Sequence, residues 1–243
     1  MSLGFGRFLE LALGTPDITS SAPFYGRLGF ASFLTGDAWQ HRYGVVGDGH
    51  IYLGLHEWSA PSPAVTFVLP QLERALTRLT ETGLQPEQAL LASDQLHQLR
   101  LRDPGGNAVL LLEARTFSPT ALEPVAESLC GYFLHLSLPQ SDYQAARAFW
   151  EVAGLIPLAA EDEPYPHLPL TGDQLNIALH PRHACATSLL VFACTELERV
   201  RARLDDLGID ADPSPPMPLD PARSLFLRAP EGSSLLLVAA PEG

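Results

Sequence analysis

Two ionisable side chains interrupt apolar, alternating runs of the chain, and they stand 125 residues apart. Glu10 lies in FLELAL at 8–13, and His135 lies in FLHLSL at 133–138. A carboxylate or an imidazole among apolar residues can ligate a metal or act as a general acid or base. Glu10 is therefore a candidate general base, and both residues are candidate contacts for a bound molecule.

Other polar and aromatic residues near these runs are also candidates for lining a binding site. Tyr43 is expected to line a cleft of the first half and to offer a hydrogen bond. Tyr165 and His167 occupy the comparable region of the second half, where aromatic residues more often pack in the core. His56 and His180 end the runs LGLH and IALH and are interpreted as solvated strand ends.

Both leading candidates also have an interpretation without function. Glu10 could pair with Arg7 or Arg42 at the rim of a cleft, which would satisfy its charge. His135 could be a core histidine that a neighbouring hydroxyl or carbonyl satisfies. The sequence leaves both alternatives open.

The elements that would position these residues repeat along the chain. A glycine ends a helix-forming stretch four times, with steps of 54, 71 and 54 residues, at Gly29, Gly83, Gly154 and Gly208. Such a glycine is typical of a left-handed helix C-terminus. The nested spacing indicates two units per half and a duplication of that half.

Each unit begins with an alternating run that predicts a strand, followed by a helix. The expected strands are 8–13, 64–69, 133–138 and 189–194, and the expected helices are 20–28, 72–82, 143–153 and 197–207. Hairpins follow, notably around DPGG at 103–106 and APEG at 229–232. Each unit is therefore predicted to have the order βαβββ, and the predicted fold class is α+β.

We expect a first domain at 5–114, a linker at 115–130 and a second domain at 131–240. The proline-rich stretch 212–221 predicts a loop near the mouth of the second cleft.

Composition restricts the functional classes. The chain of 243 residues has 28 acidic and 15 basic residues, for a net charge of −13, which argues against a nucleic-acid partner or an anionic membrane surface. No apolar run is long enough to span a bilayer, and no export signal is visible. Three cysteines, Cys130, Cys185 and Cys194, fit a reducing cytoplasm better than a disulfide framework. We therefore expect a cytoplasmic protein.

The paired units resemble a known superfamily. The chain resembles the vicinal oxygen chelate superfamily from about residue 5 to 240. The segments that carry the resemblance are FLELALGTPDI with FYGRLGF, FLHLSLPQSDY with FWEVAGL, and LRLRDPGGNAVLLL. Its members include glyoxalase I, bleomycin- and fosfomycin-resistance proteins and extradiol dioxygenases. The resemblance implies four βαβββ modules that form two glyoxalase-like domains, with curved mixed sheets around clefts. Because surfaces in this family often pair, a homodimer is one expectation.

Enzymes of this superfamily hold a divalent metal with His, Glu or Gln from the first and last strands of each unit. At the matching positions this chain has two potential ligands and six apolar residues: Glu10, His135, Ala64, Leu189, Leu53, Leu110, Ile177 and Leu236. Since catalytic sites need about three protein ligands, we expect no metal and no other cofactor. A divalent metal is expected only if strand registers are assigned wrongly, because a one-residue shift exchanges the faces of a strand.

The resemblance and the missing ligands together favour binding over metal catalysis. The leading hypothesis is a protein with degenerate metal sites that binds a small, partly apolar organic molecule in its clefts, as resistance proteins of the family do. The expected ligand contacts are Glu10, Tyr43, Leu53, Leu110, His135, Ile177 and Leu236. One alternative is a metal-dependent lyase or extradiol-type dioxygenase. Another is a metal-free enzyme that uses Glu10 as general base. The clefts could also be filled by their own side chains.

Overall fold

The four repeated units begin as the sequence predicts, with a strand followed by a helix. The computed structural model describes residues 4–35, 39–59, 61–92, 96–114, 120–122 and 124–240. The opening strands are β1 (Arg7–Gly14), β5 (Ala64–Leu69), β10 (Tyr132–Gln140) and β14 (Leu189–Cys194). The helices are α1 (Ile18–Arg27), α2 (Leu72–Glu81), α3 (Tyr143–Ala153) and α4 (Leu197–Asp206). The glycine after each helix has a positive φ, between 62° and 105°, as expected of a left-handed C-terminus.

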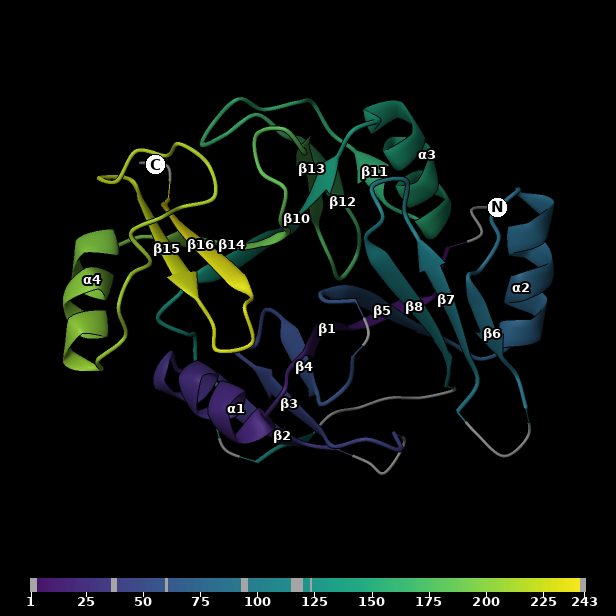
Figure 1. The fold of residues 1–243 in the computed structure, drawn as a ribbon, viewed down its shortest axis with the longest axis horizontal. Helices are drawn as coiled ribbons and strands as arrows, with labels where there is room; N and C mark the ends of the chain where they lie inside the picture. The colour runs from purple at the N-terminus through teal and green to yellow at the C-terminus, as the bar shows by residue number, and fades with distance from the viewer. Residues whose placement is uncertain are drawn as a thin grey trace.

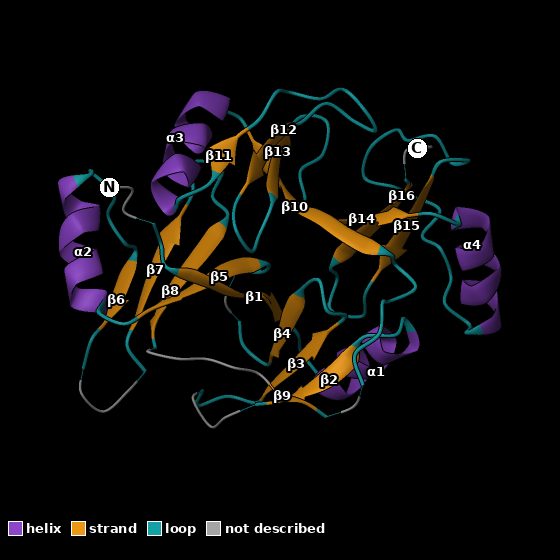
Figure 2. Cartoon of the chain, turned by 180° about the vertical axis from the view of Figure 1, so that it is seen from behind, coloured by secondary structure: helices purple, strands orange, loops and turns teal. Residues whose placement is uncertain are grey.

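Two mixed sheets carry the remaining strands, and the expected α+β class is confirmed. The first sheet adds β2 (Ala31–Leu34), β3 (Tyr43–Gly47), β4 (Tyr52–His56), β6 (Gln88–Leu90), β7 (Gln98–Arg102), β8 (Ala108–Glu113) and β9 (Thr120–Ala121). The second adds β11 (Ile156–Pro157), β12 (Leu168–Thr171), β13 (Ile177–Pro181), β15 (Ser224–Arg228) and β16 (Ser234–Ala239). Their orders are β6-β7-β8-β5-β1-β4-β3-β2-β9 and β11-β12-β13-β10-β14-β16-β15. The helices lie on the outside of the sheets (Figure 2).

Two details differ from the predicted plan. Among the described residues, the fourth unit has only two strands after its helix, because the proline-rich stretch 212–221 forms a loop that cannot continue a ladder. The stretch 115–130, expected as a linker, includes β9, which pairs with β2 at the edge of the first sheet. No helix of the described residues is long and apolar enough to cross a membrane.

A bulge in each central strand decides which side chains face the concave side of the sheet. The register shifts between Phe8 and Glu10 in β1 and between Phe133 and His135 in β10. Phe8 and Phe133 consequently pack in the large core cluster, whereas strict alternation places them on the same face as Glu10 and His135. The alternation of FLELAL and FLHLSL predicts that both phenylalanines face a cleft, and this prediction is wrong.

Each half reaches the other through a hairpin turn. The turn between β7 and β8 meets α3, where the Asp103 carboxylate accepts a hydrogen bond from Trp150 Nε1 at 3.2 Å. The turn between β15 and β16 meets α1, where Glu231 accepts one from the Tyr25 hydroxyl at 2.6 Å. Figure 1 shows both turns directed at these helices. Tyr25 and Trp150 are 125 residues apart, which is the spacing of the duplicated halves.

Candidate functional site

Glu10 lies at the centre of a buried hydrogen-bonded chain on the concave face of the first sheet. Its Oε2 accepts a 2.6 Å bond from the Tyr43 hydroxyl, and its Oε1 lies 2.9 Å from His56 Nε2. His56 Nδ1 in turn lies 2.9 Å from Nε2 of His41. Burial, followed by the charge of Glu10, raises the pKa of Tyr43, so this hydroxyl remains a donor. Both carboxylate oxygens are thus engaged, and Glu10 is 1% exposed.

The register of β4 brings His56 to Glu10 and corrects two sequence interpretations. Ala12 pairs with Gly54 and Gly14 with His56, so Gly54 and His56 share the face of Glu10. A Cβ on Gly54 would collide with the Glu10 carboxyl group, which explains a glycine at that position. Leu53, expected to face the cleft, instead packs in the core beneath the helices. His56, interpreted as a solvated strand end, is fully buried.

Aromatic side chains cover this concave face. The Trp58 ring stacks on His56 with 4.4 Å between centroids, and Trp39 meets His56 edge-on at 5.1 Å. Trp58 also packs on a small apolar cluster that contains Leu110. Arg42, one expected partner of Glu10, pairs with Glu57 instead. The first concave face is therefore occupied by the protein's own side chains around Glu10, in line with the filled-cleft alternative.

The second concave face carries a different set of buried polar groups. His135 Nε2 lies 3.1 Å from the Tyr165 hydroxyl, and His180 Nδ1 lies 2.7 Å from Ser137 Oγ. His180 Nε2 donates to the Cys185 carbonyl at 3.1 Å, so His180 is buried and bonded at both nitrogens rather than solvated. Burial is the main reason that the pKa falls to about 3 for His135 and to about 4 for His180. Both rings are neutral at pH 7.

A cavity of about 920 Å³ opens beside His135. Its apolar wall includes Leu134, Val191, Leu219 and Val238, and its polar wall includes His135, His167, Asn176, Glu161 and Arg223. Ile177 also contributes to the wall, although it is buried in the main core. Leu236 belongs to the apolar cluster beneath, with Tyr165, Met217 and Phe226. Pro218 to Asp220 line the cavity too, which confirms the expected position of the proline-rich loop.

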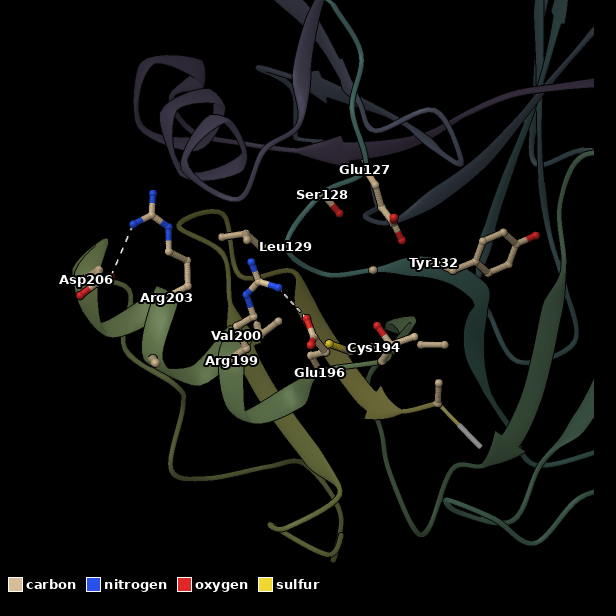
Figure 3. Close-up of a pocket in the computed structure, with 15 residues that line it drawn as sticks. Glu127, Ser128, Leu129, Tyr132, Cys194, Glu196, Arg199, Val200, Arg203 and Asp206 are labelled. Atoms are coloured by element: carbon tan, nitrogen blue, oxygen red, sulfur yellow. Dashed lines mark hydrogen bonds and ion pairs between the residues drawn. The ribbon is translucent and has the colours of Figure 1, made fainter. Parts of the chain in front are cut away.

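A cavity of about 620 Å³ lies elsewhere, between residues 127–132 and helix α4 (Figure 3). Its charged lining residues are largely paired within the protein: Arg199 with Glu196 at 2.8 Å and Arg203 with Asp206 at 3.5 Å. The floor is formed by aliphatic residues and Cys194. Because its cations already have partners, this cavity is a weaker candidate than the one beside His135.

The donor set does not fit a metal centre. Within the described residues, no three His, Cys, Asp or Glu side chains are arranged to hold an ion. The pairing of β1 with β4 does bring His56 to Glu10, but the two side chains bond to each other and to Tyr43 and His41. In the second half, His135 is bonded to Tyr165 and His180 to Ser137. A metal would have to break these buried bonds before it could be ligated.

We therefore expect purified protein, incubated separately with iron, manganese, nickel and zinc and then desalted, to retain much less than one equivalent of any metal. Elemental analysis is the measurement. Near-stoichiometric retention of one metal that disappears in Glu10→Ala or in His135→Ala would contradict this expectation. Such a result would indicate that the protein is a metalloenzyme.

Sequence reasoning missed several residues that shape these faces. Trp39 gave no periodic signal because it lies outside the repeated elements. Glu161 and Arg223 lie in loops whose course the repeat does not specify. His56 carried a usable signal: in YLGLH, the two leucines occupy one face and Gly54 and His56 the other, and the more apolar face belongs to the main core.

Known structures share the fold of this chain. No protein-family model matches it, and no curated protein matches its sequence. A catechol 2,3-dioxygenase has a TM-score of 0.60 at 15% identity, over 98% of this chain and 88% of that chain. Homoprotocatechuate 2,3-dioxygenase from Brevibacterium fuscum (the E323L mutant) gives 0.62 at 16% identity, over 98% and 72%. A halotolerant catechol dioxygenase, BphC, gives 0.58 at 13% identity, over 98% and 88%. At such identities the likeness shows the fold alone, so the chain has the two-sheet architecture of these dioxygenases.

Proposed function

We propose that this protein binds a small, partly apolar organic molecule, without a metal, in the cavity beside His135. The observation that carries the proposal is the cavity itself: about 920 Å³, with an apolar wall and a few polar groups. Cavities of this size and character are typical of small-molecule sites. The vicinal oxygen chelate resemblance supports the proposal, since its non-catalytic members bind small molecules on the same architecture.

The polar groups would fix the orientation of the ligand. His135 is bonded through Nε2 to Tyr165, and His167 donates through Nδ1 to the Tyr165 carbonyl oxygen at 2.8 Å. One tyrosine therefore positions both imidazoles, whose rings lie 5.2 Å apart. Such pre-positioned groups add specificity with little ordering cost on binding. Val191 and Val238 would contact the apolar part of the ligand.

The two alternatives from the sequence have weaker support. A metal-dependent lyase or dioxygenase agrees with the fold, but it requires a donor set that the described residues do not provide. A metal-free enzyme with Glu10 as base requires a free carboxylate oxygen facing a substrate. Both oxygens of Glu10 already accept hydrogen bonds under an aromatic cover.

A cavity-filling substitution tests the proposal. We expect small apolar alcohols and amines with one aromatic ring to raise the melting temperature of the wild-type protein and to bind in calorimetric titrations. Val238→Trp places an indole in the cavity and should weaken binding at least about tenfold, because the ligand and the new side chain compete for one volume.

Val125→Trp is the matched control, since Val125 is 40% exposed and does not line this cavity. It should leave the affinity unchanged. Equal affinity in Val238→Trp and in the wild type would show that the ligands bind elsewhere and would overturn the proposal.

A further inference from the structure

The tautomer of His167 is set by its backbone contact. His167 Nδ1 lies 2.8 Å from the carbonyl oxygen of Tyr165, and a carbonyl oxygen can only accept. Nδ1 therefore carries a proton. In the neutral ring, Nε2 is then a hydrogen-bond acceptor. His167 is 6% exposed and lines the cavity, so this acceptor belongs to the binding site.

A carboxylate stands opposite this acceptor. Glu161 Oε2 lies 3.7 Å from His167 Nε2, and both residues line the cavity. Two acceptors at this separation repel each other unless a donor or a positive charge lies between them. Either His167 takes up a second proton or a bound molecule supplies the donor. A ligand with a charged donor satisfies both groups at once.

Most of the other charges of the wall are also negative. Glu163 and Asp220 also line the cavity, and Arg223 is the single lysine or arginine among the described residues that line it, so three carboxylates face one guanidinium. Burial keeps the pKa of His135 near 3, and His135 therefore adds no positive charge at pH 7. The net charge of the whole chain is −13. A negative potential at the mouth concentrates cations there.

We propose that the cavity selects a hydrophobic amine, whose ammonium group binds between His167 Nε2 and Glu161 while its apolar body contacts Val191 and Val238. This inference rests on the proposed function and adds the chemical class of the ligand. An ammonium donates to both acceptors. A neutral alcohol can satisfy only one of them, and a carboxylate is repelled by both.

Three probes with one apolar body test this selection: 2-phenylethylamine, 2-phenylethanol and phenylacetate. Calorimetric titration of the wild-type protein at pH 7 and low ionic strength should give the tightest binding for the amine. We expect it to exceed the alcohol by about fivefold to tenfold, with phenylacetate weakest. Added salt should reduce the gap between amine and alcohol, because it screens the exposed Glu161.

Two substitutions locate the effect at Glu161, whose side chain is 59% exposed. Glu161→Gln should weaken the amine by about fivefold and leave the alcohol unchanged. Glu161→Lys should reverse the order, so that phenylacetate exceeds the amine. Glu151→Gln, an equal charge change on α3 at a residue paired with Arg147, should leave all three affinities unchanged.

The outcomes separate the two proposals. Equal affinities for the three probes, or an unchanged preference in Glu161→Gln, would overturn the amine selection and leave the proposed function standing, provided that Val238→Trp weakens them all. Failure of all three probes to bind would overturn both. A tighter complex with phenylacetate in the wild type would contradict the amine assignment directly.

Discussion

Acidification from pH 7 to pH 4 is expected to destabilise the fold by about 3–6 kcal/mol through two histidines alone. Burial lowers the pKa of His135 to about 3 and that of His180 to about 4, whereas an unfolded histidine titrates near 6.5. Between these values the unfolded chain binds more protons than the folded one. The contribution of these two histidines to the free energy of unfolding is therefore complete above pH 6.5. It falls as the pH drops towards about 4 for His180 and about 3 for His135.

The measurement is urea unfolding followed by circular dichroism at pH 7, 6, 5 and 4. His135→Gln and His180→Gln each remove one titrating group, so each should reduce the dependence of the unfolding free energy on pH over this range. They should do so even though they lower the stability at pH 7, where the lost buried bonds dominate.

His183→Gln provides the control, because His183 is exposed in the loop after β13. Its pH dependence should equal that of the wild type. A wild-type slope in both buried variants would mean that the two imidazoles accept protons without unfolding. Acid sensitivity would then have to come from the carboxylates.

The sequence predicted the elements well because they are locally encoded. The opening runs alternate with period two, and each helix ends at a glycine whose positive φ the structure confirms, as at Gly154 with φ 105°. Because the unit is repeated, the same pattern of a strand followed by a helix and a glycine occurs four times in one sequence. Helix α3 begins and ends at the expected residues, 143 and 153.

The orientation of side chains within strands was less predictable. Alternation fixes a face only while the ladder is regular, and the bulge before Glu10 changes the face between Phe8 and Glu10. In β4 the choice between Leu53 and Gly54 as the cleft-facing residue depends on which face meets the larger core. That face is set by β1 and the helices together, and the only local indication is that the two leucines of YLGLH make one face of β4 more apolar.

The partner of Glu10 illustrates the same limit. Arg42 carries a positive charge and could pair with the Glu10 carboxylate. The parallel pairing of β1 with β4 places His56 beside Glu10 instead. The positions of His41 and Trp39 then follow from the course of the loop at 39–42. Long-range pairing decides these contacts. Spacing within one unit could indicate only that Glu10 needs a partner.

The junction between the halves is a further feature that only the assembled fold reveals. Asp103 is 3% exposed, and its carboxylate accepts hydrogen bonds from Asn107, Gln140 and Trp150. Gly105 follows in the same turn. A Cβ there would collide with the carbonyl oxygen of Pro139 in β10. The DPGG turn is thus required both for the hairpin and for close approach of the second half.

Asp103→Ala is accordingly expected to cost about 3–5 kcal/mol of unfolding free energy, because it leaves several buried donors without an acceptor. Trp150 is fully buried, so its indole N–H cannot turn to water. The corresponding fall in melting temperature is on the order of 10 °C for a chain of this length. Thermal and urea unfolding measure both quantities.

Trp150→Phe tests whether the loss arises at the junction. If Asp103 acts through the Trp150 N–H, the double variant should lose less stability than the sum of the two single variants. Asp205→Ala, which removes an exposed carboxylate from α4, should change the free energy by no more than about 0.5 kcal/mol. Strict additivity of Asp103→Ala and Trp150→Phe would instead show that Asp103 acts through its other donors, Asn107 in its own turn and Gln140 in β10.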